Sequence, residues 1–169
     1  MDRERLKATQ APLKQRYEQE PEAAVVTLKA SGSLGDGISC SVDTGRALAE
    51  AGLHPASGGD GTQLCSGDML LEALVACAGV TLRAVATSLG IPVESGSVHA
   101  EGELDFRGTL AVDRDAPVGF RAIRLNFDLD TNANEEELDT LLKLTERYCV
   151  VFQTLSTPPE LSGSVATKS

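Results

Sequence analysis

Apolar and polar residues alternate along the first half of the chain in a way that predicts a β-hairpin. Residues 24–30 alternate like a strand, and the glycine-rich stretch 32–37 turns the chain toward a second strand at Ile38–Val42. A third short strand is expected over residues 46–50. Cys40 shares one face of the second strand with two apolar neighbours, so we expect it to fill the core as a small hydrophobe.

The first twenty residues are polar, and Pro12 interrupts them, so one or two short surface helices are expected. The long uncharged run 70–82 predicts a central helix over about 67–89, with Ser66 as its N-cap and Gly90 as its left-handed C-cap. Apolar residues surround this helix almost completely, so neighbours must cover more than one side of it. A second subunit would provide that cover.

Two strands are expected next, at Ser97–Phe106 and Val118–Asp130, each with one apolar and one polar face. The apolar phase of the second strand changes near Ala122, which indicates a β-bulge there. The last helix is expected after the capping residues 132–134. One regular stripe of that helix would be buried, and it comprises Leu138, Leu142, Thr145, Cys149 and Phe152.

Thr157 and Pro158 end the last helix, and a final strand is expected around Leu161–Ala166. The order of elements predicts an α+β fold with a mostly antiparallel sheet and two core helices. We expect a single domain over residues 24–169, preceded by a helical extension at residues 1–23.

Composition narrows the possible functions. The net charge of the 169-residue chain is −10, and its 15 basic residues form no stripe, so nucleic acid is not an expected partner. The apolar run 73–82 is shorter than the roughly 20 residues of a membrane span, so no membrane partner is expected. No apolar segment follows the charged first residues, so we expect a cytoplasmic protein. Glycine patterns typical of nucleotide sites are absent from the sequence.

Four cysteines, Cys40, Cys65, Cys77 and Cys149, carry the candidate chemistry. They form no C-x-x-C pair, and neither histidine is spaced with them as in zinc sites, so we expect no metal. In a reducing cytosol, the remaining interpretations are catalysis and core filling, and the sequence leaves both open for Cys77 and Cys149. Cys65, at a loop edge, is either a passive thiol or a trap for oxidised Cys77.

Two cysteines would suffice to reduce a peroxide. A thiolate attacks the O–O bond and becomes a sulfenic acid, which a second thiol converts to a disulfide. The helical neighbours of Cys77 are uncharged, so a lowered pKa would require a cation from another element. Arg46, Arg124 and Arg147 are the candidates.

The segment Cys65–Arg83, preceded by Gly58–Gly61, resembles the core helix of the OsmC/Ohr family, which comprises osmotically inducible protein C and the organic hydroperoxide resistance proteins. Glu146–Cys149 resembles the second-cysteine region of that family, and the likeness covers about residues 24–166. It implies an OsmC-like intertwined homodimer in which mostly antiparallel sheets wrap two central helices. It also places active sites at the subunit interface.

The resemblance further implies a cytoplasmic peroxidase that reduces organic hydroperoxides or hydrogen peroxide. Cys77 would be the peroxidatic thiol and Cys149 the resolving thiol, with no bound cofactor and a dithiol as reductant. The family places an arginine in the early strands and a glutamate ahead of the helix, and Arg46 and Asp68 are nearest to those places. Val150 replaces the usual proline, and the turn 32–37 lacks arginine. The alternative is a non-enzymatic dimer of this fold that binds an apolar ligand or serves a stress role.

Overall fold

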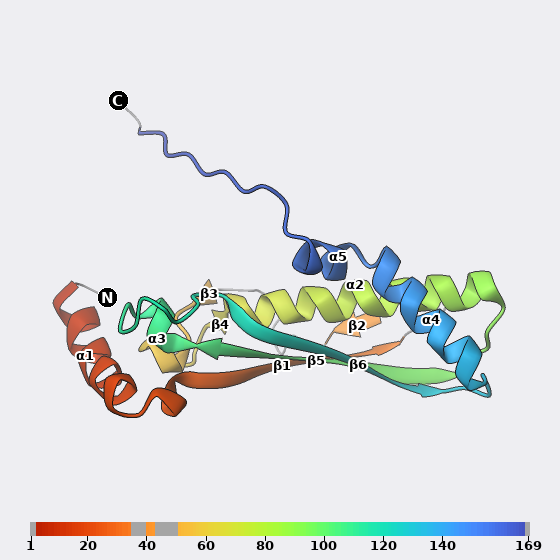
Figure 1. The fold of residues 1–169 in the computed structure, drawn as a ribbon, viewed down its shortest axis with the longest axis horizontal. Coiled ribbons are helices and arrows are strands. Elements are labelled where there is room, and N and C mark those ends of the chain that lie inside the picture. Colours follow the sequence, from red (N-terminus) through yellow and green to blue (C-terminus); the bar gives the residue numbers. More distant parts are fainter. Residues whose placement is uncertain (1–2, 35–39, 43–50, 168–169) are drawn as a thin grey trace.

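A four-stranded antiparallel sheet forms the base of the molecule in a computed structural model that describes residues 3–34, 40–42 and 51–167 (Figure 1). The strand order is β2-β1-β5-β6, and a separate parallel pair joins β3 to β4. The bounds are β1 Val25–Leu34, β2 Cys40–Val42, β3 Ala51–Gly52, β4 Leu64–Cys65, β5 Ser95–Asp105 and β6 Phe120–Asp130. The expected α+β class and the β1–β2 hairpin pairing are therefore confirmed.

Alternation along β5 and β6 sets one apolar face against the helices. Val98 and Ala100 are completely buried, whereas the His99 side chain between them is 44% exposed on the opposite face. The predicted bulge is also present. Glu103 pairs with Ala122 but Leu104 pairs with Phe120, so Arg121 is the extra residue. This extra residue restores the apolar phase of the rest of β6.

The long helix α2, Ser66–Leu89, lies along one face of the sheet (Figure 1). Its bounds confirm the predicted central helix, although Cys65 occupies the N-cap position and Ser66 is the first helical residue. Gly90 ends α2 with a φ of 70°, which glycine adopts without strain. By length and composition alone α2 could cross a membrane. Here its buried face, Leu71, Leu74, Val75, Ala78 and Leu82, packs in the core.

The expected single last helix is instead two helices, α4 Glu135–Tyr148 and α5 Val150–Ser156. Asn134 and Glu137 form the capping box that begins α4, as the predicted capping region required. The predicted buried stripe is partly wrong, because Leu138 and Leu142 are 36% and 42% exposed. Thr145 and Cys149, which also belong to that stripe, are buried as predicted, and Leu141 is buried in place of Leu142. Leu141 and Leu142 both lie at helical spacing from Thr145, so periodicity alone did not choose between them.

At the opposite end of the molecule, α1, Arg3–Gln19, is one continuous helix, so the predicted interruption at Pro12 is wrong. Pro12 lies on its exposed side. Tyr17 anchors the helix, because its ring is buried in a cluster with Ala24 and Phe106 and its hydroxyl donates to the Ala56 carbonyl at 2.8 Å. The remaining short helices at this end are η1 Pro21–Ala24, η2 Pro55–Ser57 and α3 Phe106–Thr109.

The predicted final strand is absent, because residues 157–167 form no strand and extend away from the body (Figure 1). Leu161 and Val165 are 86% and 94% exposed there. A strand needs a pairing partner, and none of the described strands pairs with this segment. The predicted strand at residues 46–50, the turn at 35–37 and the side chain of Cys40 lie outside the described residues.

Packing between α2 and α4 stabilises the helical layer, and its contribution to the free energy of unfolding can be measured. Leu141 is 1% exposed and packs in a cluster with Leu82. Replacing Leu141 by Ala should lower the free energy of unfolding by about 2–5 kcal/mol, because it leaves a cavity in that cluster. Chemical denaturation monitored by circular dichroism measures the change. The control Lys143→Ala, on the exposed side of α4, should change it by less than about 0.5 kcal/mol. Equal losses in both variants would contradict this packing.

Candidate active site

Two thiols that are far apart in the sequence meet above the sheet. Cys77 is half-buried on α2, and Cys149, at the junction of α4 and α5, is completely buried. Cys149 belongs to the core cluster that contains Leu74, Val75 and Ala78, and Cys77 packs against that cluster. A side-chain hydrogen bond joins the two sulfurs, although both cysteines are free thiols. Contact between the two sulfurs is the first geometric condition for a disulfide between these residues.

The backbone at Cys149 creates this arrangement. Its φ of −72° and ψ of 109° are extended, so the helix stops there and begins again at Val150. The Cys149 N–H still donates to the Thr145 carbonyl at 2.9 Å, and its sulfur accepts the Phe152 N–H at 3.5 Å. Cys149 thus ends one helix and caps the next.

The interruption of the helix at Cys149 also leaves two backbone N–H groups available to Cys77. In a continuous helix, the N–H groups of Val150 and Val151 would bond to carbonyls four residues earlier. As the first residues of α5 they have no such partners, and both donate to the Cys77 sulfur. Sequence reasoning missed these two donors. The only signal was the adjacent β-branched pair after Cys149, which is weak because valine occurs often inside helices.

Hydrogen bonds and burial act in opposite directions on the pKa of the Cys77 thiol. Burial is the largest single influence and raises the pKa of the Cys77 thiol. The N–H groups of Val151 and Val150, the Cys149 thiol and the Thr81 hydroxyl act in the opposite direction and together outweigh burial. The net effect is a pKa for Cys77 below the ordinary value of a thiol, which favours the nucleophilic thiolate.

Cys149 has the opposite character. Burial, the largest cause, raises the pKa of Cys149 to about 11, even though the Phe152 N–H acts to lower it. At neutral pH Cys149 is therefore a thiol, and it is the donor in its hydrogen bond with Cys77. The pair thus consists of one thiol that ionises easily and one that keeps its proton.

Of the other two predicted site residues, only Asp68 is described, and it is not brought to this pair. Arg46 lies outside the described residues. Asp68 is in the first turn of α2, about 13 Å before Cys77 along the helix axis. Burial raises the pKa of the Asp68 carboxyl, and the charge of nearby His54 opposes that shift. His54 itself stacks on Phe106, with ring centroids 5.0 Å apart. The structure therefore places Asp68 beside His54 at the start of α2.

The two other arginines proposed as sources of positive charge have different partners. Arg124 is bound to Glu101 and Glu103 on the outer face of the sheet. Arg147 is exposed and lies over the Tyr148 ring, 5.8 Å from its centroid. Cys65 is partly buried at the N-terminus of α2, about 18 Å from Cys77 along the axis. In the described ranges, no three His, Cys, Asp or Glu side chains gather as metal ligands would.

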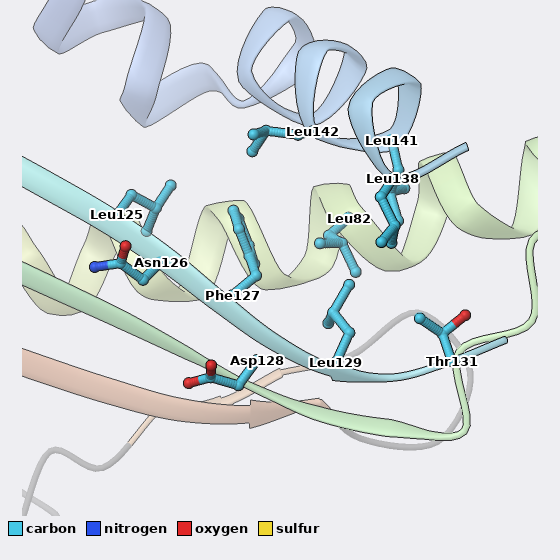
Figure 2. Close-up of a pocket in the computed structure, with 10 residues that line it drawn as sticks. All are labelled: Leu82, Leu125, Asn126, Phe127, Asp128, Leu129, Thr131, Leu138, Leu141 and Leu142. Atoms are coloured by element: carbon cyan, nitrogen blue, oxygen red, sulfur yellow. The ribbon is translucent and has the colours of Figure 1, made fainter. Parts of the chain in front are cut away.

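Two largely apolar grooves lie along β6, and their lining includes neither Cys77 nor Cys149. One, of about 500 Å³, is bordered by Leu74 of α2, Phe120 and Ile123 of β6, and Phe152 of α5. Leu74 lies one turn before Cys77, and Phe152 lies one turn after Cys149. The second groove, of about 570 Å³, lies between β6 and α4 (Figure 2). Leu125 borders both grooves, so they meet along β6.

Comparisons with known proteins agree with this architecture. No curated protein sequence matches the chain. An OsmC-like hydroperoxide resistance protein from Jannaschia sp. CCS1 superimposes with a TM-score of 0.61 and 16% identity, over 85% of this chain and 95% of that one. An OsmC-like protein from Mycoplasma pneumoniae gives a TM-score of 0.56 and 16% identity, over 79% and 86%. The sequence profile described as OsmC-like protein matches residues 59–162, which include both cysteines of the pair, and the chain therefore belongs to the OsmC-like family.

Proposed function

We propose that this protein is a thiol-dependent peroxidase that reduces organic hydroperoxides or hydrogen peroxide. The observation that carries the proposal is the contact between Cys77 and Cys149, with the pKa of one lowered and that of the other raised. Family membership and the structural likeness to a hydroperoxide resistance protein support a peroxidase role in general. The residue roles that follow are inferred from the geometry of this chain.

The proposed reaction begins with the Cys77 thiolate. Its sulfur attacks the distal oxygen of ROOH, the O–O bond breaks, and Cys77 becomes a sulfenic acid while RO⁻ leaves. The alkoxide takes the proton of the adjacent Cys149 thiol and departs as ROH. The Cys149 thiolate then attacks the Cys77 sulfur and displaces hydroxide, which leaves as water after protonation. The two thiols have then given up the two electrons that reduce the peroxide, and the pair is left oxidised as a disulfide.

A dithiol reductant must restore the two thiols, because the next cycle needs a free Cys77 thiolate. Reduction by thiol exchange requires no bound cofactor. The apolar groove beside Leu74 and Phe152 favours hydroperoxides with an organic chain, because burial of that chain contributes to binding. We place this reaction in the cytosol, where dithiol donors are available.

We also propose that the protein is a homodimer. Residues at heptad spacing form an uncharged stripe on α2, which comprises Leu70, Ala73, Cys77, Val80, Ala84 and Thr87. Leu70 and Val80 are 36% and 38% exposed, although they lie in the middle of the most apolar helix. A second copy that packs on this stripe and on the adjoining grooves would cover them. Cys77 would then lie close to the interface.

Substitution of Cys77 tests the assignment of the nucleophile. Cys77→Ser should abolish peroxide consumption in the presence of a dithiol, because a hydroxyl does not ionise at neutral pH. The rate is measured by the loss of cumene hydroperoxide. Cys65→Ser is the matched control and should keep the wild-type rate. An unchanged rate in Cys77→Ser would reject the peroxidase proposal and favour the alternative of an apolar-ligand protein.

The pH dependence of thiol reactivity tests the hydrogen bond between the sulfurs. Alkylation of Cys77 by iodoacetamide, followed by peptide mass spectrometry, should rise with pH to a midpoint below that of an ordinary thiol, because the pKa of Cys77 is lowered. In Cys149→Ala the midpoint should move upward, because the thiolate loses one donor. Cys149→Ser keeps a donor and should move it less. A midpoint that is the same in all three proteins would show that Cys149 does not stabilise the thiolate.

A charge on the α2 stripe tests the dimer. Val80→Asp should halve the mass measured by light scattering, because a carboxylate would have to be buried without a partner at the interface. Gln15→Asp, on the exposed side of α1, adds the same charge elsewhere and should leave the mass unchanged. Thermal unfolding monitors the fold of both variants. A folded Val80→Asp protein with the wild-type mass would contradict the proposed interface, as would a monomeric wild type.

A further inference from the structure

We propose that His54 controls a pH-sensitive latch, which holds α1 on the body of the protein while the His54 ring is neutral and releases α1 when that ring is protonated. The latch comprises His54 and the hydrogen bonds that join α1 to the short helix η2. Both helices precede residues 59–162, which match the family profile. The latch therefore goes beyond the proposed peroxidase reaction and does not depend on it.

Two side chains of α1 reach backbone carbonyls of η2. The Tyr17 hydroxyl donates to the Ala56 carbonyl at 2.8 Å, and the Gln10 amide donates to the Ser57 carbonyl at 3.1 Å. A Cβ added at Gly58, directly after η2, would meet the Thr9 methyl group at 3.0 Å, so α1 lies close against the end of η2. Docking of α1 therefore depends on the conformation of residues 56–58.

His54 fixes that conformation from the N-cap position of η2. Its Nδ1 accepts the Ala56 N–H at 3.0 Å, and its carbonyl accepts the Ser57 hydroxyl at 2.9 Å. The ring is held in place by stacking on Phe106, with an interplanar angle of 23°. An Nδ1 atom that accepts a hydrogen bond carries no hydrogen, so the neutral ring has its hydrogen on Nε2. Protonation of Nδ1 would set two N–H donors against each other and remove the cap of η2.

Few charged groups act on this ring. Asp68, in the first turn of α2, favours the protonated ring and is the one charged group among the described residues that shifts the pKa of His54. The contacts that α1 and α3 make with η2 come from neutral side chains. Arg107 of α3 is paired with Asp105 and Asp113 instead. Protonation of His54 is therefore set by burial, the lost hydrogen bond and one carboxylate.

The sign of the pH dependence follows from this balance. Burial outweighs Asp68 and holds the pKa of His54 below the ordinary histidine value of 6.5. A released ring regains that ordinary value, so the docked state binds fewer protons than the released state between the two pKa values. Docking of α1 is thus favoured above pH 6.5 and weakens as the pH falls from there toward the lowered pKa.

Hydrogen exchange of the α1 amides in the full chain tests the latch, when it is measured by mass spectrometry and corrected for the intrinsic rate at each pH. Between about pH 7.5 and about pH 5, the range in which histidine changes its charge, protection of α1 should fall about 3- to 10-fold, as for the loss of a helix cap. The α4 amides in the same samples are the internal reference and should keep their protection.

Two substitutions separate His54 from other causes. His54→Asn keeps an N-cap acceptor that cannot be protonated, so α1 should stay protected at both pH values. His99→Asn, at the other histidine of the chain, is the matched control on the outer face of the sheet and should behave as the wild type. Wild-type protection of α1 that does not change with pH would overturn the inference. A His54→Asn protein that loses protection as the wild type does, or a flat profile in His99→Asn, would also overturn it.

Nitrogen NMR of the wild-type His54 ring gives a second measurement that needs no variant. We expect a neutral ring with its hydrogen on Nε2, and a titration that follows the loss of α1 protection. A neutral ring with its hydrogen on Nδ1, or a titration unrelated to α1 protection, would reject the latch. Peroxide consumption plays no part in these measurements, so their outcome is separate from that of the proposed function.

Discussion

The interruption of the last helix at Cys149 is the constraint on which the site depends. A single extended residue ends α4, caps α5 with its own sulfur, and leaves the N–H groups of Val150 and Val151 free to donate to Cys77. If the helix continued, those N–H groups would be used within it, and the Cys77 thiol would lie in an apolar core with few donors. Burial would then raise its pKa, as burial does for Cys149. One local backbone feature thus separates a thiol with a lowered pKa from a thiol with a raised pKa.

This arrangement also shows how a buried thiolate can be stabilised by neutral groups. Arg124 and Arg147, the two described arginines with a possible role, lie on the outer face of the sheet and on the exposed side of α4. Among the described residues, the groups that lower the pKa of Cys77 are neutral hydrogen-bond donors: Thr81, Cys149 and two backbone amides. Because the surroundings are apolar, each of these bonds is stronger than it would be in water. The same surroundings keep Cys149 protonated, so a thiol proton lies next to the Cys77 sulfur.

Much of the fold could be predicted from local patterns. Period-two alternation predicted β5, β6 and the bulge near Ala122, and Gly90 predicted the end of α2, because these features depend on neighbours in the sequence. The division of the last helix depends on tertiary contacts with α2, so the spacing of Leu138, Leu142 and Cys149 could not reveal it. Pro12 inside α1 is tolerated because distant packing of Tyr17 holds the helix. The catalytic roles assigned to Cys77, Cys149, Arg46 and Asp68 stay predictions, whereas the donors at Val150 and Val151 became visible only in three dimensions.

The central claim is that Cys77 and Cys149 form one redox pair, and its most direct measurement is the mapping of disulfides after oxidation. The folded protein is treated with one equivalent of cumene hydroperoxide, blocked with iodoacetamide, digested and analysed by mass spectrometry. We expect one dominant cross-link between the peptides that contain Cys77 and Cys149, with Cys65 still alkylated. Oxidation of Cys77 to sulfinic or sulfonic acid with Cys149 left as an alkylated thiol, or a cross-link that excludes Cys149, would contradict the account.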